Sequence, residues 1–373
     1  MAKGIYFGVE AVARKVRKLY FGVDGVARKV RKTYIGIDGI ARLIYIAGMS
    51  KTNSAPALTD STYSVGAASN KGYAIFAGGA GAVTSVNAYN NLLTKVIPAA
   101  LIIGRYAISG TTVGDYAIFG GGYDGNVLYA HVEAYSSSLI KVIPTGLRAT
   151  TYSHANSVAR TTSYAIFTGG ASSYSQYATA YSDTLIRVAT VHDGTGNTNA
   201  AGASVNGYAI IGGGYYGNSS QAGVAAYNDS LVRVTAIALS TARHNLRAAS
   251  IGNSYALFAG GNGPVSNGTG PVATVDVYDV NLTRSTLAPL NRPKMYFTGA
   301  SLSDYALFAG GTGMYPAGPI ADVEYYDTNL VKTMAPSLNS AKAYLASAVI
   351  NDKILIAGGN PGSATNEVEV YEA

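Results

Sequence analysis

Short apolar runs of five residues, each followed by two glycines, recur along most of the chain. The run at 305–311 reads Tyr-Ala-Leu-Phe-Ala-Gly-Gly. Six further copies share this pattern and begin at Tyr73, Tyr116, Tyr164, Tyr208, Tyr255 and Lys353. Apolar runs of this length between turn residues are typical of buried β-strands, and the two glycines mark a tight turn or a close backbone approach. Seven such copies predict a repeat fold, either a solenoid or a propeller.

A second pattern, Val-x-x-Tyr, follows each of these runs. It begins at Val86, Val132, Ala178, Val224, Val275, Val323 and Val368, with Ala178 as the weakest match. In the first six units a leucine lies four residues after the tyrosine and a cation lies six residues after it, as with Leu330 and Lys332. We assign one strand to the diglycine run, one to Val-x-x-Tyr, one to Leu-x-cation and one to the segment before the next unit, such as 297–301. Four strands in each of seven units predict an all-β, seven-bladed β-propeller.

The seventh unit lacks its Leu-x-cation strand, because only two residues follow Tyr371. The segment Met49-Ser50-Lys51 supplies a match, and 51–58 is similar to 332–338. We therefore expect the strand after the N-terminal segment to complete the last blade, which would close the ring and remove an open sheet edge.

Residues 4–48 contain a shorter repeat, whose copies start at Tyr6, Tyr20 and Tyr34. Asp24-Gly25 and Asp38-Gly39 lie between β-branched residues, which favours two-residue hairpin turns. We predict a meander of six short strands. A helix over 26–32 is the alternative, although so short a helix would be marginal. The chain thus divides into a basic hairpin-repeat attachment domain at 1–46 and a propeller at 47–373.

Positive charge is concentrated in the hairpin repeat. Residues 1–48 carry ten Lys or Arg and three Asp or Glu, which accounts for the whole net charge of +7. These cations form either a solvated strand face or a surface that docks on an acidic protein; binding to nucleic acid is disfavoured, since no aromatic stacking platform accompanies them. The candidate docking residues are Arg14, Lys15, Arg17, Lys18, Arg28, Lys29, Arg31, Lys32 and Arg42.

The residue types present argue against catalysis. The chain has no Cys and no Trp, and its four histidines, His131, His154, His192 and His244, are scattered. No nucleophile elbow, phosphate loop or carboxylate pair stands out. We therefore expect a non-enzymatic protein without cofactor or metal.

The sequence has neither the apolar core of a signal peptide nor a run long enough to span a membrane, so synthesis in a cytoplasm without a signal peptide is expected.

Loops between each diglycine and the following Val-x-x-Tyr should open on one side of the ring. They are rich in Tyr, Ser, Gly and Asn, which supply rigid contact area and adaptable hydrogen bonds in binding loops. These loops either bind a glycan or protein, or are ordinary polar turns. The candidate ligand-binding residues are Tyr123, Tyr129, Tyr174, Tyr177, Tyr215, Tyr216 and Tyr315.

Two resemblances extend these expectations. The diglycines, the Val-x-x-Tyr-Asp segments at 275–279 and 323–327 and the unit length resemble kelch repeats over 47–373, although kelch repeats usually carry a Trp that is missing here. Residues 4–46 resemble repeated segments of tail-associated structural proteins in phages of Gram-positive bacteria. This resemblance implies a virion protein, located in a tail fibre or baseplate, that docks on other virion proteins through 1–46 and displays the propeller for receptor binding.

Three alternatives stay open. The protein could be a decoration protein of a capsid or tail, a cytoplasmic kelch-type interaction scaffold, or, with the least support, a lectin-like enzyme whose site the sequence does not reveal. A homo-oligomer is compatible with each of them.

Overall fold

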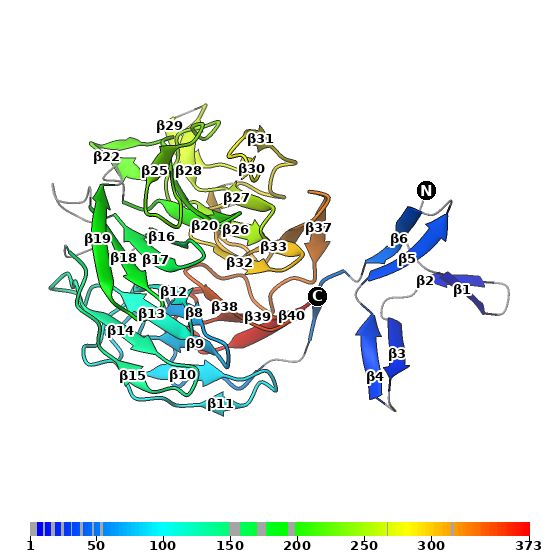
Figure 1. Ribbon diagram of the computed structural model, residues 1–373, viewed down its shortest axis with the longest axis horizontal. Helices are drawn as coiled ribbons and strands as arrows, with labels where there is room; N and C mark the ends of the chain where they lie inside the picture. Colours follow the sequence, from blue (N-terminus) through cyan, green and yellow to red (C-terminus); the bar gives the residue numbers. More distant parts are fainter. Residues whose placement is uncertain are drawn as a thin grey trace.

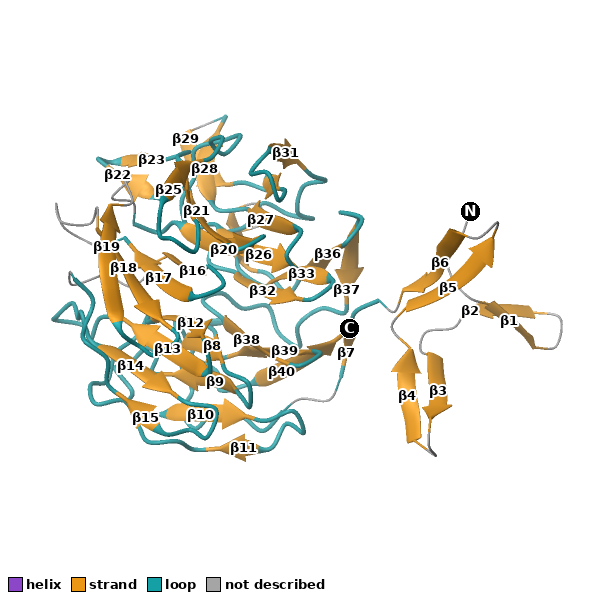
Figure 2. Cartoon of the chain, viewed as in Figure 1, coloured by secondary structure: helices purple, strands orange, loops and turns teal. Residues whose placement is uncertain are grey.

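The computed structural model describes residues 6–9, 12–15, 19–23, 26–30, 32–37, 40–46, 48–52, 55–148, 157–169, 177–192, 198–266, 268–314 and 317–373. Seven four-stranded antiparallel sheets surround a central axis (Figure 1). All regular elements of the described residues are strands (Figure 2), and no helix long and apolar enough to cross a membrane is found among them. The predicted all-β seven-bladed propeller is confirmed.

Each blade runs from an inner strand beside the axis to an outer strand at the circumference. The inner strands are β8 (Gly66–Ser69), β12 (Ser109–Val113), β16 (Ser157–Arg160), β20 (Ala201–Val205), β26 (Arg247–Ile251), β32 (Thr298–Leu302) and β38 (Ala346–Ile350). The second strands, which hold the apolar runs, are β9 (Ala74–Ala77), β13 (Tyr116–Gly120), β17 (Tyr164–Thr168), β21 (Tyr208–Gly212), β27 (Tyr255–Ala259), β33 (Tyr305–Ala309) and β39 (Lys353–Ala357).

The Val-x-x-Tyr pattern forms the third strands, and the cation that follows it starts or lies in each outer strand. The third strands are β10 (Val86–Tyr89), β14 (Val132–Tyr135), β18 (Tyr177–Ser182), β24 (Val224–Tyr227), β30 (Val275–Tyr278), β36 (Val323–Asp327) and β40 (Val368–Glu372). The outer strands are β11 (Lys95–Val96), β15 (Lys141–Val142), β19 (Arg187–His192), β25 (Arg233–Thr235), β31 (Arg284–Thr286), β37 (Lys332–Ala335) and β7 (Ser50–Lys51).

Two details of the predicted unit are wrong. The strand before each apolar run belongs to the same blade as that run: β32 pairs with β33, and a two-residue turn joins Leu302 to Tyr305. The connection from the outer strand of one blade to the inner strand of the next therefore passes between blades, and we call each of these connections a crossover segment. The leucine of Leu-x-cation is not a strand residue. In all six units it is a turn residue, with left-handed φ values of 57° to 63°, as at Leu330.

Apolar side chains fill the seams between neighbouring blades. In one seam Ile75 and Ala77 of the first blade pack with Ile108, Phe119 and Tyr135 around the second. Fully burying a side chain of this size stabilises the fold by about 1.5–3 kcal/mol. The apolar runs are buried on both faces because each blade is covered by a neighbour on either side, which explains their continuous rather than alternating hydrophobicity.

In six blades the hydroxyl of the Val-x-x-Tyr tyrosine binds the backbone of the segment that enters its own blade. Tyr135 is fully buried, and its hydroxyl donates to the Ala99 carbonyl at 2.8 Å. Burial raises the pKa of this phenol above its usual value near 10. Nearby, Lys141 Nζ donates to the Ala100 carbonyl at 2.6 Å, so the cation of Leu-x-cation binds the same crossover segment.

The diglycines form both a tight turn and a close backbone approach, the two roles that the sequence suggested. Gly310 and Gly311 have φ values of 69° and 104°, in the left-handed region that glycine tolerates best. Gly311 N donates to the Lys342 carbonyl of the next blade at 2.9 Å, and a Cβ on Gly310 would lie 2.7 Å from the same oxygen. The diglycine thus lets one blade approach the backbone of the next.

The ring closes as predicted. β7 is the fourth strand of the last blade, with Lys51 opposite Tyr371 and Ser50 opposite Glu372. The contact continues beyond the strand, where Thr52 N donates to the Val370 carbonyl at 2.9 Å. The Lys51 ammonium also lies 2.6 Å from a carboxylate oxygen of Glu369.

The N-terminal repeat contains the six expected strands, but they do not form one meander. Among its described residues the strands pair only two by two, in three separate hairpins. These are β1 (Tyr6–Val9) with β2 (Val12–Lys15), β3 (Leu19–Val23) with β4 (Val26–Val30), and β5 (Lys32–Ile37) with β6 (Ile40–Ile46). The alternative of a helix over 26–32 is wrong, because β4 occupies most of it.

The hairpin register is the same in all three copies. Phe7 is opposite Arg14, Phe21 is opposite Arg28, and Ile35 is opposite Arg42. Val23 is opposite Val26, as a two-residue connection at Asp24-Gly25 requires. Of the other candidate docking residues, Lys15, Lys29 and Lys32 belong to strands, while Arg17, Lys18 and Arg31 lie outside the described residues.

Candidate functional site

One end of the ring, which we call the channel mouth, is where the crossover segments enter the inner strands. The residue two positions before each inner strand has a left-handed backbone in all six blades where it is described. These residues are Ser64, Ala107, Asn199, Asn245, Tyr296 and Tyr344, with φ values of 53° to 57°. Because residues as different as Ala and Tyr adopt it, this conformation is imposed by the blade rather than chosen by one side chain.

Backbone hydrogen bonds connect these residues around the channel mouth. Tyr344 N donates to the Tyr296 carbonyl at 2.8 Å, and Ser64 N donates to the Tyr344 carbonyl at 2.9 Å. Ala107 N continues the series to the Ser64 carbonyl at 2.6 Å, and on the other side of the ring Asn245 N donates to the Asn199 carbonyl at 2.9 Å. Each amide donates to a carbonyl of the preceding blade, so these bonds form a backbone frame that joins neighbouring blades at the mouth.

Aromatic side chains from the same segments contact one another at the channel mouth. Tyr296 and Tyr344 are stacked with ring centroids 4.6 Å apart, and Tyr63 lies 5.9 Å from Tyr344. Two further pairs join the crossover segments to the turns after the diglycines: Tyr106 with Tyr123 at 5.5 Å, and His244 with Tyr215 at 4.8 Å. We call these seven half-buried residues the aromatic rim: Tyr63, Tyr106, Tyr123, Tyr215, His244, Tyr296 and Tyr344.

The predicted loop tyrosines divide between the rim and other places. Tyr123 and Tyr215 belong to the rim, and Tyr216, which is 55% exposed, is beside Tyr215 on the hairpin of β22 (Tyr215–Tyr216) and β23 (Ser219–Ser220). Tyr129 instead binds its own loop, since its hydroxyl donates to Asp124 Oδ2 at 2.7 Å, a bond that raises the pKa of the phenol. Tyr177 begins β18, and Tyr174 and Tyr315 lie outside the described residues.

His244 is held in the rim by polar contacts as well as by stacking. Its Nδ1 lies 2.9 Å from Ser220 Oγ, and its Nε2 lies 3.4 Å from Asn262 Nδ2. Burial lowers the pKa of the imidazole, which favours the neutral ring. In the part of the chain that the structure describes, no group of three or more His, Asp or Glu residues could hold a metal ion.

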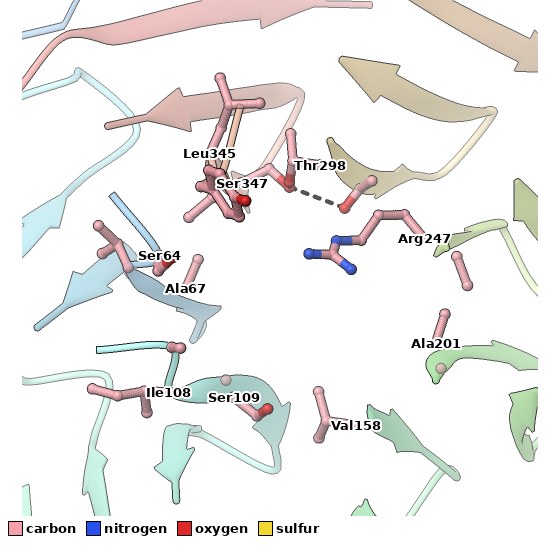
Figure 3. Close-up of a pocket in the computed structure, with 18 of the residues that line it drawn as sticks. Ser64, Ala67, Ile108, Ser109, Val158, Ala201, Arg247, Thr298, Leu345 and Ser347 are labelled. Atoms are coloured by element: carbon pink, nitrogen blue, oxygen red, sulfur yellow. Dashed lines mark hydrogen bonds between the residues drawn. The ribbon is translucent and has the colours of Figure 1, made fainter. Parts of the chain in front are cut away.

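Inside the mouth is a cavity of about 220 Å³, lined mainly by the inner strands (Figure 3). Arg247 is the one charged residue of its described lining, and its guanidinium extends into the cavity from one side. Hydroxyl groups line other parts of the wall, including Ser64 and the pair Thr298 and Ser347, whose oxygens are 2.7 Å apart. A second cavity of about 310 Å³ lies toward the other end of the inner strands and includes Arg160.

Sequence reasoning missed Arg247 and most of the rim. A signal for Arg247 was present, because it begins an inner strand where the other six blades have Gly, Ser, Ala or Thr. The rim tyrosines Tyr63, Tyr106, Tyr296 and Tyr344 also recur at similar places before the inner strands. Their gathering could not be foreseen, since it depends on the crossover segments, which the predicted unit placed incorrectly.

Comparisons with known proteins support the fold alone. No family model matches the chain, and no curated protein matches it. Among solved structures 551 chains match, so the architecture is widespread and does not by itself select a function. One of them, titled "Structure of YjhT", has a TM-score of 0.55 and 14% sequence identity, and the match covers 84% of this chain and 96% of that chain.

Proposed function

We propose that the protein is a non-enzymatic binding component of a phage or phage-tail-like particle, located in a tail fibre or baseplate. In this proposal the hairpin repeat docks on other virion proteins, and the propeller, which resembles kelch repeats, binds a host-surface glycan or protein. The observation that carries the binding role is the aromatic rim. Tyrosines offer large amphipathic contact area at low entropic cost, and the backbone frame holds them in place.

The attachment role is supported by the hairpins. Their register repeats unchanged through three copies, with one arginine opposite an apolar residue in each copy. A regular basic array suits a repetitive, acidic surface such as an assembled particle. The resemblance of residues 4–46 to tail-associated phage proteins points to the same partner, and the virion is then the protein's location after synthesis in the host cytoplasm.

Adsorption to host cells tests the binding role. The variant Tyr215→Ala with Tyr216→Ala removes two aromatic side chains from one loop of the mouth, and Tyr123→Ala removes one from another. We expect particles that carry all three substitutions to adsorb more weakly, while the melting temperature of the purified protein stays close to that of the wild type. Leu92→Ala is the matched control, because Leu92 is highly exposed at the outer edge. Unchanged adsorption of the triple variant would refute the binding role of the rim.

A decoration protein of a capsid or tail is a second candidate, favoured by a different surface. The outer strands and the turns before them expose apolar residues, among them Ile140 at 64% and Ile186 at 62%. Exposed apolar residues gathered on one surface often mark a protein interface. Particles whose assembly, rather than adsorption, fails after Ile140→Ser with Ile186→Ser would favour this candidate.

A further inference from the structure

Arg247 carries a positive charge that the described structure leaves without a counter-ion. Within the described residues its guanidinium donates one hydrogen bond, from NH1 to the neighbouring Leu246 carbonyl at 3.0 Å, although the group has five N–H donors. Among the described residues no carboxylate lies within ion-pair distance of it. Burial lowers the pKa of this side chain, and only the nearby Tyr296 acts in the opposite direction.

Arg243, four residues earlier, shows how this protein normally treats a buried arginine. Its guanidinium lies 2.9 Å from Asp276 Oδ2, and both side chains are fully buried. A buried charge without a partner costs free energy, whereas a charge with a partner recovers much of it. Arg247 differs from Arg243 in being only partly buried, with its guanidinium extending into the cavity, so its charge is open to a partner from outside the chain.

Ser64 supplies an independent observation on the other side of the same cavity. The residue is only 9% exposed, and its Oγ is buried without a hydrogen-bond partner. Figure 3 shows Ser64 and Arg247 facing the cavity from opposite sides. Buried hydroxyls almost always have a partner, so an orphaned one beside a cavity marks a place for a ligand atom or a water molecule.

We propose that the cavity inside the channel mouth binds an oxyanion, the carboxylate or phosphate of a small hydroxylated ligand, with Arg247 as its counter-ion and Ser64 as a hydrogen-bond partner. The planar fork of an arginine matches two oxygens of such a group at once. No carboxylate lines the described part of the cavity to repel the anion, and its volume of about 220 Å³ far exceeds the roughly 10–15 Å³ that one water molecule needs.

This inference rests on the proposed function, because it names the chemistry of the ligand that the channel mouth would receive. The aromatic rim would contact the outer part of that ligand, and Arg247 would bind its charged end. Hydroxylated acids and sugar phosphates both fit this description, and the experiment separates them.

Calorimetric titration of the full-length protein tests the proposal with three probes: D-glucuronate, glucose 6-phosphate and neutral D-glucose. We expect at least one of the two anions to bind more tightly than glucose, and we expect Arg247→Gln to weaken that binding by about tenfold or more, as for a hydrogen-bonded charge pair. Ser64→Ala should weaken it by a smaller factor. Arg160→Gln is the matched control, since it removes an arginine that lines the second cavity and not this one, and it should leave the affinity unchanged.

Thermal melting gives a second readout. The binding anion should raise the melting temperature of the wild type but not that of Arg247→Gln, because a ligand that binds only the folded state stabilises it. Arg247→Lys, which keeps the charge but loses the fork, serves if Arg247→Gln does not fold, and it should still lose most of the affinity. Equal affinity of Arg247→Gln and the wild type, or no anion binding by the wild type, would overturn the proposal.

Failure of this inference differs from failure of the proposed function. If rim variants lose adsorption while no anion binds, the anion site is wrong and the binding role of the rim stands. If Arg247 binds an anion while rim variants adsorb normally, the anion site stands and the binding role of the rim falls.

Discussion

The guanidinium of Arg105 lies 3.1 Å from Glu133 Oε1, and both side chains are fully buried. Arg105 also connects two blades, because its carbonyl accepts a hydrogen bond from Gly79 N of the preceding blade at 3.0 Å. Lys141 approaches the same carboxylate at 3.4 Å. Three other blades repeat this arrangement, with the buried pairs Arg243 and Asp276, Lys294 and Glu324, and Lys342 and Glu369.

Breaking one of these pairs should be costly. We expect Glu133→Ala to lower the free energy of unfolding by about 3–5 kcal/mol, because it leaves the Arg105 charge buried and unpaired. Denaturant unfolding of the wild type and the variant measures this difference.

The first blade supplies a matched control for this prediction. It has Thr62 and Asn87 where the second blade has Arg105 and Glu133. The double variant Arg105→Thr with Glu133→Asn copies that neutral pair, and we expect it to be more stable than Glu133→Ala alone. A double variant less stable than the single one would show that the charges are needed for more than mutual compensation.

The buried pairs show what the sequence could and could not reveal. Each cation follows a leucine by four residues, as Arg105 follows Leu101, and each accompanies a carboxylate at the second position of Val-x-x-Tyr. This co-occurrence was visible, but its meaning depended on knowing that the crossover segment enters the blade that follows it. The strands themselves were predictable because a buried apolar run is a local signal that repeats seven times.

Ring closure could also be predicted, whereas the aromatic rim at the channel mouth could not. The missing seventh Leu-x-cation match left one strand to be supplied, and only 49–51 fitted it. In contrast, the aromatic rim combines residues from separate blades, and the left-handed backbone at Tyr296 and Tyr344 follows from blade geometry rather than from the preference of tyrosine. Long-range assembly of this kind leaves little trace in local sequence.

The close approach at the diglycines predicts a difference between two glycine substitutions. Gly311 and Gly125 have similar φ values, 104° and 109°, so alanine is strained equally at either position. A Cβ on Gly311 would lie 2.8 Å from the Met295 carbonyl oxygen, whereas a Cβ on Gly125 would meet nothing within 4 Å. We expect Gly125→Ala to cost about 1 kcal/mol of stability and Gly311→Ala to cost clearly more. Equal melting temperatures for the two variants would contradict the close packing of adjacent blades.

The neutral His244 predicts a pH dependence of stability. Burial lowers its pKa in the folded protein below the ordinary value of 6.5, so the unfolded chain binds a proton more readily. Stability contributed by the neutral ring is therefore full well above pH 6.5 and is lost progressively as the pH falls from about that value through the lower pKa of the folded state. His131 has a pKa lowered mainly by burial and should act in the same direction.

Melting curves between about pH 7.5 and 5.5 would measure this effect across the unfolded pKa of histidine. We expect His244→Gln to reduce the loss of melting temperature on acidification, and the double variant with His131→Gln to reduce it further. An unchanged pH profile in the double variant would mean that other groups control acid stability.

The closing strand and the hairpin repeat predict opposite results for two truncations. Removal of residues 1–47 leaves β7 in place, including the Lys51 contact with Glu369 at 2.6 Å. Removal of residues 1–58 deletes β7 and also the bonds of Ala55 N and Leu58 N to the carbonyls of Val368 and Asn366. We expect the first truncation to melt like the full chain. The second should melt much earlier or aggregate, because it exposes the edge of β40.

Particle binding completes this test, because the shorter truncation removes the docking residues but keeps the closed ring. We expect it to fail to join particles, whereas residues 1–46 fused to an unrelated domain should be carried onto them. If the cations make the contact, attachment should weaken as salt rises past about 0.15 M, where exposed charges are screened within about 8 Å. Attachment that is insensitive to salt would point instead to the apolar residues of the hairpins, such as Phe7, Phe21 and Ile35. Normal incorporation of the truncated propeller would refute the attachment role of the repeat.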